Sequence, residues 1–227
     1  MIRWDPGDPY EIAFTTRVGG VSEGPFESLN LGLKTDDDPE RATENRRRVC
    51  AAVGAEPERL ALNYQVHGTT VNRAVAGSRG VHGDALWTDE PDLPIAALSA
   101  DCLPIVLVNG AAVAVVHAGW RGLLAGVVEN AVAAIGGAVT AMIGPAIGPC
   151  CYEVGDEVRE PYRERFGDEV VAGTHLDLWR AAELALGGCD VERLDLCTSC
   201  NPELFFSHRR DGARTGRQGV IAVKRQP

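Results

Sequence analysis

The chain has 227 residues, of which 45% are hydrophobic, which is ample for one packed domain but short for two substantial ones. Its net charge of −10 argues against nucleic acid or an anionic membrane surface as the main partner, because both would repel it. No basic start followed by an apolar run is present, so the sequence predicts a cytoplasmic protein without a signal peptide. Seven cysteines, an odd number, fit reduced thiols in that compartment.

Local patterns predict a mixture of strands and helices within one domain spanning residues 1–227. Strands are predicted at 10–16, 66–75, 85–87, 95–99, 105–108, 111–116, 193–197 and 219–223. Helices are predicted at 39–53, 119–135, 156–166 and 178–186, the first because Pro39 stands near its start and charges fill its exposed face. This order favours an α+β fold, a single layered domain with mixed sheets and flanking helices.

A hairpin signal in the middle of the chain predicts which residues face each other. Asn109-Gly110, between two apolar runs, is typical of a two-residue turn. Such a turn places Cys102 directly opposite His117, with Cβ atoms about 4.5–5.5 Å apart. Because Pro104 has no backbone N–H, we expect a bulge or an early end to the strand pairing, with Cys102 and His117 still near neighbours.

A thiol and an imidazole at this spacing suit either a shared metal or a nucleophile with its base. His67, in the segment Gln65–Gly68, is the candidate third ligand. Two histidines and one cysteine are suitable zinc donors, and three protein ligands leave a fourth position for water or substrate. The spacing alone leaves a plain alternative open, since isolated buried cysteines usually pack as small hydrophobic residues. Asp84 is a candidate outer partner of a ligand, or a proton acceptor.

Other cysteines and charges also form candidate sites. Cys197 and Cys200 have the C-x-x-C spacing of zinc or redox sites, and Cys150-Cys151 could complete four thiolates. A single C-x-x-C is a weak signal and adjacent cysteines are unlike a normal half-site, so we interpret these four as structural thiols. Near the end of the chain lies a basic cluster that either is solvated or binds a small anion: Arg209, Arg210, Arg214, Arg217, Lys224 and Arg225.

Several common catalytic motifs are missing from the sequence. It has no Walker A loop, no G-x-G-x-x-G, no G-x-S-x-G, no H-E-x-x-H and no nucleotide-deaminase pattern H-x-E…P-C-x-x-C. A multicopper cluster would need many histidines, whereas the chain has five and no H-x-H pair.

Nine segments together carry a resemblance that covers almost the whole chain. They are 15–22, 28–31, 65–68, 83–85, 100–104, 116–122, 143–147, 152–155 and 206–212. The most specific are Ala-Asp-Cys-Leu-Pro at 100–104 and Val-His-Ala-Gly-Trp-Arg-Gly at 116–122. With these segments the chain resembles the bacterial laccase-domain, or multicopper polyphenol oxidase, family, whose members are regarded as purine nucleoside phosphorylases with adenosine deaminase activity.

The resemblance implies a zinc ion, or copper, on His67, Cys102 and His117, which are also the expected catalytic residues. It implies phosphorolysis of adenosine, inosine and methylthioadenosine and deamination of adenosine, so the expected partners are nucleosides and phosphate. We expect seven polar residues of the matching segments to bind substrate, the arginines among them as candidates for phosphate: Arg17, Asn30, Asp84, Asp101, Arg121, Arg209 and Arg210.

Three rival functions remain at this point. One is an amidase acting on peptidoglycan precursors, with Cys102 as nucleophile and His117 as base. The second is a copper-dependent polyphenol oxidase. The third is a zinc-binding module without catalysis, which would leave the charged loop residues unexplained.

Overall fold

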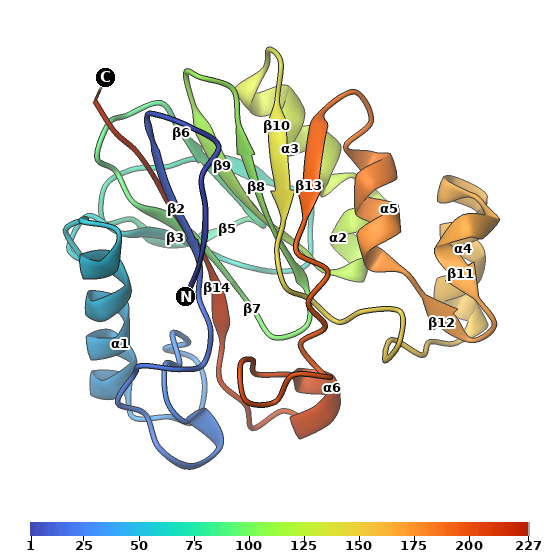
Figure 1. Ribbon diagram of the computed structural model, residues 1–227, viewed down its shortest axis with the longest axis horizontal. Helices are drawn as coiled ribbons and strands as arrows, with labels where there is room; N and C mark the ends of the chain where they lie inside the picture. The colour runs from blue at the N-terminus through green and yellow to red at the C-terminus, as the bar shows by residue number, and fades with distance from the viewer. Residues whose placement is uncertain (227) are drawn as a thin grey trace.

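Two six-stranded sheets pack face to face in the computed structural model, which describes residues 1–226 (Figure 1). The first sheet has the order β1 (Ile2–Trp4), β2 (Tyr10–Phe14), β14 (Gln218–Lys224), β7 (Ile95–Ser99), β3 (Ala61–Tyr64) and β5 (Arg79–His82). The second has the order β13 (Asp190–Arg193), β10 (Thr140–Ile143), β8 (Leu103–Val108), β9 (Val113–Ala118), β6 (Ala85–Thr88) and β4 (Val71–Arg73). Both sheets combine parallel and antiparallel pairs, and β11 (Val171–Ala172) pairs with β12 (His175–Leu176) in a separate ribbon.

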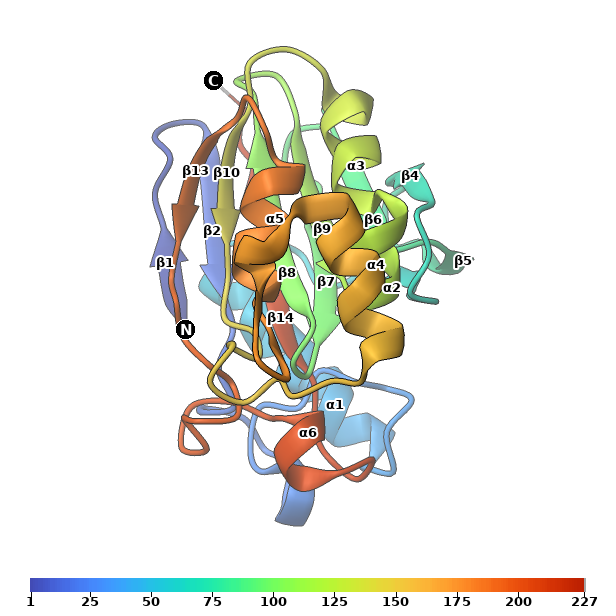
Figure 2. The ribbon, with the colours of Figure 1, turned by 90° about the vertical axis from the view of Figure 1, so that its right-hand side faces the viewer.

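Helices cover the outer faces of the two sheets. On the first sheet lies α1 (Pro39–Ala52), which begins where the Asp38 carboxylate accepts the Glu40 N–H. On the second lie α2 (Trp120–Ala125), α3 (Val127–Ile135), α4 (Asp156–Phe166) and α5 (Leu178–Ala185), and α6 (His208–Asp211) stands near one end of the sheets (Figure 2). The short 3-10 helices are η1 (Gly24–Phe26) and η2 (Asp168–Val170). No helix within residues 1–226 is long and apolar enough to cross a membrane.

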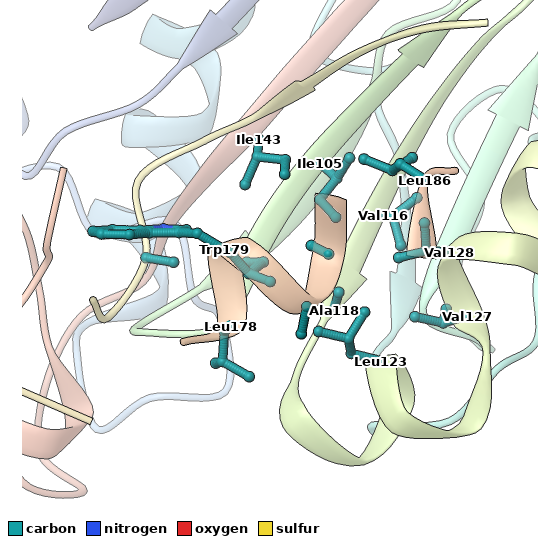
Figure 3. Close-up of a cluster of buried hydrophobic side chains, with 14 of the residues drawn as sticks. Ile105, Val116, Ala118, Leu123, Val127, Val128, Ile143, Leu178, Trp179 and Leu186 are labelled. Atoms are coloured by element: carbon teal, nitrogen blue, oxygen red, sulfur yellow. The ribbon is translucent and has the colours of Figure 1, made fainter. Parts of the chain in front are cut away.

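Side chains along a strand point alternately to its two faces, and this alternation explains the layering. Every residue of β8 and β9 is buried, because each strand has one face against the helices and one against the other sheet. Ile105 and Leu107 pack with the helices, whereas Val106 and Val108 pack against the first sheet. Figure 3 shows the helix-facing cluster, in which Val128 and other side chains of α2, α3 and α5 lie against the second sheet. The structure thus confirms an α+β fold with mixed sheets and flanking helices.

Some predicted elements differ from the observed ones. The predicted helix 119–135 is two helices, because Gly126 adopts a left-handed φ of 101° between them. Of the predicted strand 66–75 only Val71–Arg73 is extended, and the predicted strand 193–197 is replaced by Asp190–Arg193. Six of the described strands were not predicted. They are β1, β3, β5 and β10, each of three or four residues, and the two-residue β11 and β12.

The β8–β9 hairpin corrects the predicted register. Its connection has four residues, 109–112, and not two, because the Asn109 side chain accepts the backbone N–H groups of Ala111 at 3.0 Å and Ala112 at 2.7 Å. His117 therefore faces Pro104 and not Cys102. A shift of two residues leaves each side chain on its original face, so Cys102 and His117 still point to the same side.

The predicted interruption at Pro104 does not occur. The strand pairing continues through Pro104 to the pair Leu103–Ala118. The Pro104 carbonyl accepts the Gly144 N–H at 2.9 Å on the side of β10, and in a strand the amide nitrogen points to the same side as its carbonyl. The N–H that Pro104 lacks would point away from β9, so its absence does not interrupt the pairing of β8 with β9.

Candidate active site and metal centre

The structure brings together the three residues predicted as metal ligands. The candidate ligand atoms of His67, Cys102 and His117 lie within 4.8 Å of one another. The Cys102 sulfur is 3.7 Å from Nε2 of His67, and the two imidazole rings stand nearly perpendicular, with centroids 4.8 Å apart. The residues come from the loop after β3, the turn before β8 and the end of β9. Three segments distant in sequence thus meet at one end of the sheets.

A single carboxylate holds two of these segments in place. Asp84, which is 1% exposed, accepts the backbone N–H groups of Val66 at 3.2 Å, His67 at 2.9 Å and Gly68 at 2.7 Å. These bonds wrap the loop around the carboxylate and hold His67 at a left-handed φ of 58°. The same carboxylate lies 2.8 Å from Nδ1 of His117, which leaves Nε2 of that ring as its free ligand atom.

A second buried carboxylate shapes the turn that carries Cys102. Asp101 has a left-handed φ of 89° and is 8% exposed. Its carboxylate accepts the Thr198 hydroxyl at 2.6 Å and the Arg209 backbone N–H at 2.7 Å. Asp101 therefore ties the Cys102 turn to the start of α6 and to the loop after β13, at the edge of the cleft described below.

Gly119, where α2 begins, allows the three ligands to approach each other. A Cβ atom at this position would lie 2.5 Å from Cδ2 of His67 and 3.1 Å from the Cys102 sulfur. Both distances are shorter than normal carbon contacts, so no side chain fits here unless His67 moves. Glycine at this position is a steric requirement of the site.

The electrostatics favour a thiolate. Burial opposes ionisation of Cys102, but the neighbouring His117 and His67 lower the pKa of its thiol to about 6. Burial likewise opposes the charged form of His117, but Cys102 and Asp84 raise the pKa of its imidazole to about 9. Without a metal these two groups therefore form a thiolate–imidazolium pair at neutral pH. The thiolate is the form of cysteine that binds metals and attacks electrophiles.

The donor set fits a zinc ion. Two imidazoles and one thiolate are typical zinc donors, and the sulfur-to-nitrogen distance of 3.7 Å is close to the edge of about 3.6 Å that tetrahedral zinc bonds produce. A carboxylate behind a ligating histidine is the usual outer partner at such sites, and Asp84 occupies that position behind His117. Copper(I) also accepts sulfur and imidazole ligands, so the donors alone do not separate the two metals.

The three ligands line a cleft of about 690 Å³, a volume within the usual range for small-molecule sites. Aromatic rings of Tyr64, Trp120 and Tyr152 form parts of its wall. Of the lining residues that the structure describes, Asp101 is the one carboxylate, whereas six are cationic: Lys34, Arg46, Arg79, Arg121, Arg209 and Arg217. A chain with a net charge of −10 thus has a cleft suited to an anion.

Two of the predicted substrate-binding arginines line this cleft. The Arg121 guanidinium lies over the Trp120 ring, 4.2 Å from its centroid, and makes no hydrogen bond or ion pair with residues 1–226. Arg209 lies over the Tyr152 ring at 5.1 Å and donates to the Glu153 carbonyl at 2.7 Å. Of these two arginines, Arg121 is therefore the more available to a ligand.

Four other predicted substrate-binding residues are not part of the cleft lining: Asp84, whose partners are described above, and Arg17, Asn30 and Arg210. Arg17 donates to two backbone carbonyls, at 2.7 and 2.9 Å, and lies over the Phe206 ring. Arg210 pairs with Asp211 and donates to three backbone carbonyls. Asn30 is fully buried and holds the loop that leads to residues 32–35 of the cleft. These three side chains already have protein partners, so we leave them out of the anion site.

Several lining residues were not predicted from the sequence. Lys34, Arg46 and Arg79 lie in separate segments without a motif around them, and no sequence signal connects them. Arg217 belongs to the basic cluster near the end of the chain, which was a usable signal. Ser99, at the end of β7, is 3% exposed and lines the cleft, and its hydroxyl has no hydrogen-bond partner within the described chain. Such a hydroxyl is available to a bound ligand.

Comparisons with known proteins identify relatives over nearly the whole chain. The family model described as multi-copper polyphenol oxidoreductase laccase matches residues 11–225. The chain is 41% identical to a purine nucleoside phosphorylase of Pseudomonas aeruginosa, covering 94% of this chain and 93% of that protein. It is 39% identical to the Escherichia coli purine nucleoside phosphorylase YfiH, covering 95% of this chain and 94% of that protein.

A solved structure has the same fold. The crystal structure of YlmD from Geobacillus stearothermophilus superposes with a TM-score of 0.89 at 35% identity, covering 98% of this chain and 94% of that one. Both the sequence matches and this superposition extend over nearly the full length of the chain. The chain therefore belongs to the multi-copper polyphenol oxidoreductase laccase family, several of whose members are named purine nucleoside phosphorylases.

Proposed function

We propose that this chain is a metal-dependent purine nucleoside phosphorylase that accepts adenosine, inosine and methylthioadenosine and also deaminates adenosine. One observation carries the proposal. A single cleft contains the His67, Cys102 and His117 group, six cations and three aromatic rings, in a chain whose relatives are named for this activity. We further propose that residues 1–227 form one catalytic domain, since one apolar cluster contains strands of both sheets.

Phosphorolysis requires an anion site beside the ribose. A phosphate oxygen forms a bond to C1′ while the bond from C1′ to the purine nitrogen breaks, and the purine leaves with the electron pair and takes up a proton. Arg121 and Arg209 are the proposed phosphate ligands, and Arg217 is a further cation of the same lining, because charge-assisted bonds from arginine are strong and bidentate. The chain as a whole is acidic and repels phosphate. The excess of positive charge in the cleft lining offsets this repulsion.

The base requires stacking surfaces and hydrogen-bond partners. Tyr64, Trp120 and Tyr152 are the proposed stacking surfaces. Each ring has a cation over one face, so a purine would use the opposite face or displace the cation. An aromatic pair contributes about 0.5–1.5 kcal/mol beyond the burial of its area. The buried hydroxyl of Ser99 is a proposed hydrogen-bond partner for a ring nitrogen or the exocyclic group.

His67, Cys102 and His117 would hold the metal, and a zinc ion there would supply a Lewis acid able to ionise water near neutral pH. The residues around it have defined tasks. Asp84 holds the proton at Nδ1 of His117, so that Nε2 is the ligand atom. His117 and His67 keep Cys102 ionised. For deamination, water replaces ammonia at C6 of the purine, which requires such an activated water and no phosphate.

The test is an incubation of the purified chain with a panel of nucleosides, with and without phosphate, followed by chromatography. We expect free purine and a sugar 1-phosphate only with phosphate: ribose 1-phosphate from adenosine and inosine, and 5-methylthioribose 1-phosphate from methylthioadenosine. Without phosphate we expect inosine from adenosine. Chelation should abolish both reactions, and zinc should restore them. Cys102→Ala should lose the metal and both activities, whereas Cys189→Ala, at a half-buried thiol outside the site, should retain them.

The rival functions give different results in the same experiment. An amidase would be inactivated by thiol alkylation and unaffected by chelation, because a Cys102–His117 pair needs no metal. A polyphenol oxidase would consume oxygen with phenolic substrates only when loaded with copper. Failure of every nucleoside to react in the zinc-loaded chain would overturn the proposal.

A further inference from the structure

A second group of potential metal ligands lies apart from the active site. The sulfur atoms of Cys150, Cys151, Cys197 and Cys200 lie within 4.8 Å of one another, and none of these residues belongs to the first group. The sequence pattern alone favoured structural thiols over a metal site, since Cys150 and Cys151 are adjacent. Because the structure brings all four sulfur atoms together, we propose that they hold a structural zinc ion.

The distances between the sulfur atoms agree with a shared metal. The Cys200 sulfur is 3.4 Å from that of Cys150 and 3.3 Å from that of Cys151. Four thiolates around zinc, with bonds of about 2.3 Å, place their sulfur atoms about 3.8 Å apart. A disulfide requires about 2.05 Å. The adjacent cysteines thus contribute two corners of the group, and the C-x-x-C segment contributes the other two.

A backbone N–H group supports an ionised sulfur in this group. Cys197, which is buried, accepts the Gly148 N–H at 3.3 Å. Such bonds stabilise thiolates, the form that zinc requires. Gly148 is needed for this approach, since a Cβ atom there would lie 2.6 Å from the Trp179 ring and 3.3 Å from Cβ of Cys197. Binding of Zn²⁺ by four thiols releases four protons, which balances the reaction.

The zinc ion would join one segment that reaches the cleft lining to a second segment that supports the Cys102 turn. The segment 148–152 ends at Tyr152, which lines the cleft, and begins beside the bridge between Ala146 and Cys197. The segment 197–200 contains Thr198, whose hydroxyl bonds to Asp101. A metal linking these segments therefore fixes the surroundings of the Cys102 turn without contacting the substrate. Cys150 and Cys200 are exposed, so the ion would be accessible to chelators.

Metal analysis of single variants of the full chain tests the proposal. We expect about two zinc ions per chain in the unchanged protein, and about one in both Cys150→Ser and Cys200→Ser. The matched control Cys189→Ser should retain both ions, since this half-buried thiol is outside the group. Melting temperatures of the two ligand variants should fall relative to that control.

A second measurement separates this site from the proposed active site. The Cys102→Ala chain, stripped of metal, should bind about one equivalent of Co²⁺ and develop the intense visible bands of a tetrathiolate complex. That result is expected whether or not the active site binds metal. Absence of Co²⁺ binding in this variant, zinc retained by Cys200→Ser at the level of the unchanged chain, or a native mass showing a disulfide within the group would each overturn the proposal.

Discussion

Nδ1 of His117 lies 2.8 Å from Oδ1 of Asp84, and the two side chains are 3% and 1% exposed, respectively. The same carboxylate binds the backbone of the loop that carries His67. One buried residue thus sets the ring orientation of one proposed ligand and the main-chain position of another. It also stabilises the charged imidazole that keeps the Cys102 thiol ionised.

Asp84→Asn should weaken zinc binding about 10–100-fold, the usual cost of losing an outer partner of a metal ligand. The amide presents one acceptor oxygen to four donors and cannot compensate a charged imidazole. Competition with a chromogenic chelator measures the affinity. Asp89→Asn, at an exposed carboxylate paired with Arg73, is the control and should bind zinc like the unchanged chain. An unaltered affinity in Asp84→Asn would show that the metal lies elsewhere.

The metal-free chain should have a Cys102 that is reactive at unusually low pH. With a thiol pKa of about 6, most of Cys102 is thiolate at pH 7, so its alkylation rate should rise through pH 6 and level off near neutrality. Cys189, whose thiol pKa is raised by burial, should react only at higher pH and serves as an internal reference. Mass spectrometry of peptides after timed alkylation reports both rates.

The same assay also tests the role of Asp84 in this ionisation. Loss of its negative charge lowers the pKa of His117, and a neutral His117 no longer stabilises the thiolate. The midpoint for Cys102 alkylation should therefore move to higher pH in Asp84→Asn. A midpoint that stays in place would assign the ionisation of Cys102 to other groups.

Arg121→Ala should raise the phosphate KM about tenfold or more, since one charge-assisted contact is lost. Zinc content should be unchanged and adenosine deamination much less affected, because that reaction uses no phosphate. Arg73→Ala is a matched control, since Arg73 also lies over a tryptophan ring but outside the cleft. Equal loss of both activities in Arg121→Ala would indicate a contact with the nucleoside, and its assignment to phosphate would be withdrawn.

Gly119→Ala should disrupt the metal site through steric contact alone. The added methyl group would meet the His67 ring at 2.5 Å, and displacing that ring removes one of three ligands. We expect most of the zinc at this site to be lost while the fold is retained, as measured by metal analysis and circular dichroism. Gly187→Ala, whose nearest contact is 3.3 Å away, should keep its zinc. Full zinc occupancy in Gly119→Ala would show that the loop at 65–70 can shift to accommodate the methyl group, and would contradict the steric requirement for glycine.

The sequence determined the elements whose pattern is strong and local. The apolar strands around 95–118 and the helix at 39–52 follow from side-chain period and from Asp38 and Pro39 at the helix start. The sequence also predicted correctly that Cys102 and His117 point to the same side of the β8–β9 hairpin, but it did not predict which residues pair. The Asn109 side chain makes hydrogen bonds that give a connection of four residues in place of two. Only the folded chain shows these hydrogen-bond partners.

The tertiary structure alone decided which charges share the cleft and which cysteines meet. Lys34 lies in a loop, Arg46 on α1 and Arg79 at the start of β5, so they meet only because the sheets and α1 pack together, and no local pattern encodes that packing. Arg17 and Arg210 appear in strong motifs, yet the folded chain brings backbone carbonyls within reach of their guanidinium groups, which bond to them. The four-cysteine group likewise depends on a parallel bridge between Ala146 and Cys197, a contact across 51 positions of sequence. Residue types limit the available chemistry, whereas long-range packing selects the side chains that remain free to perform it.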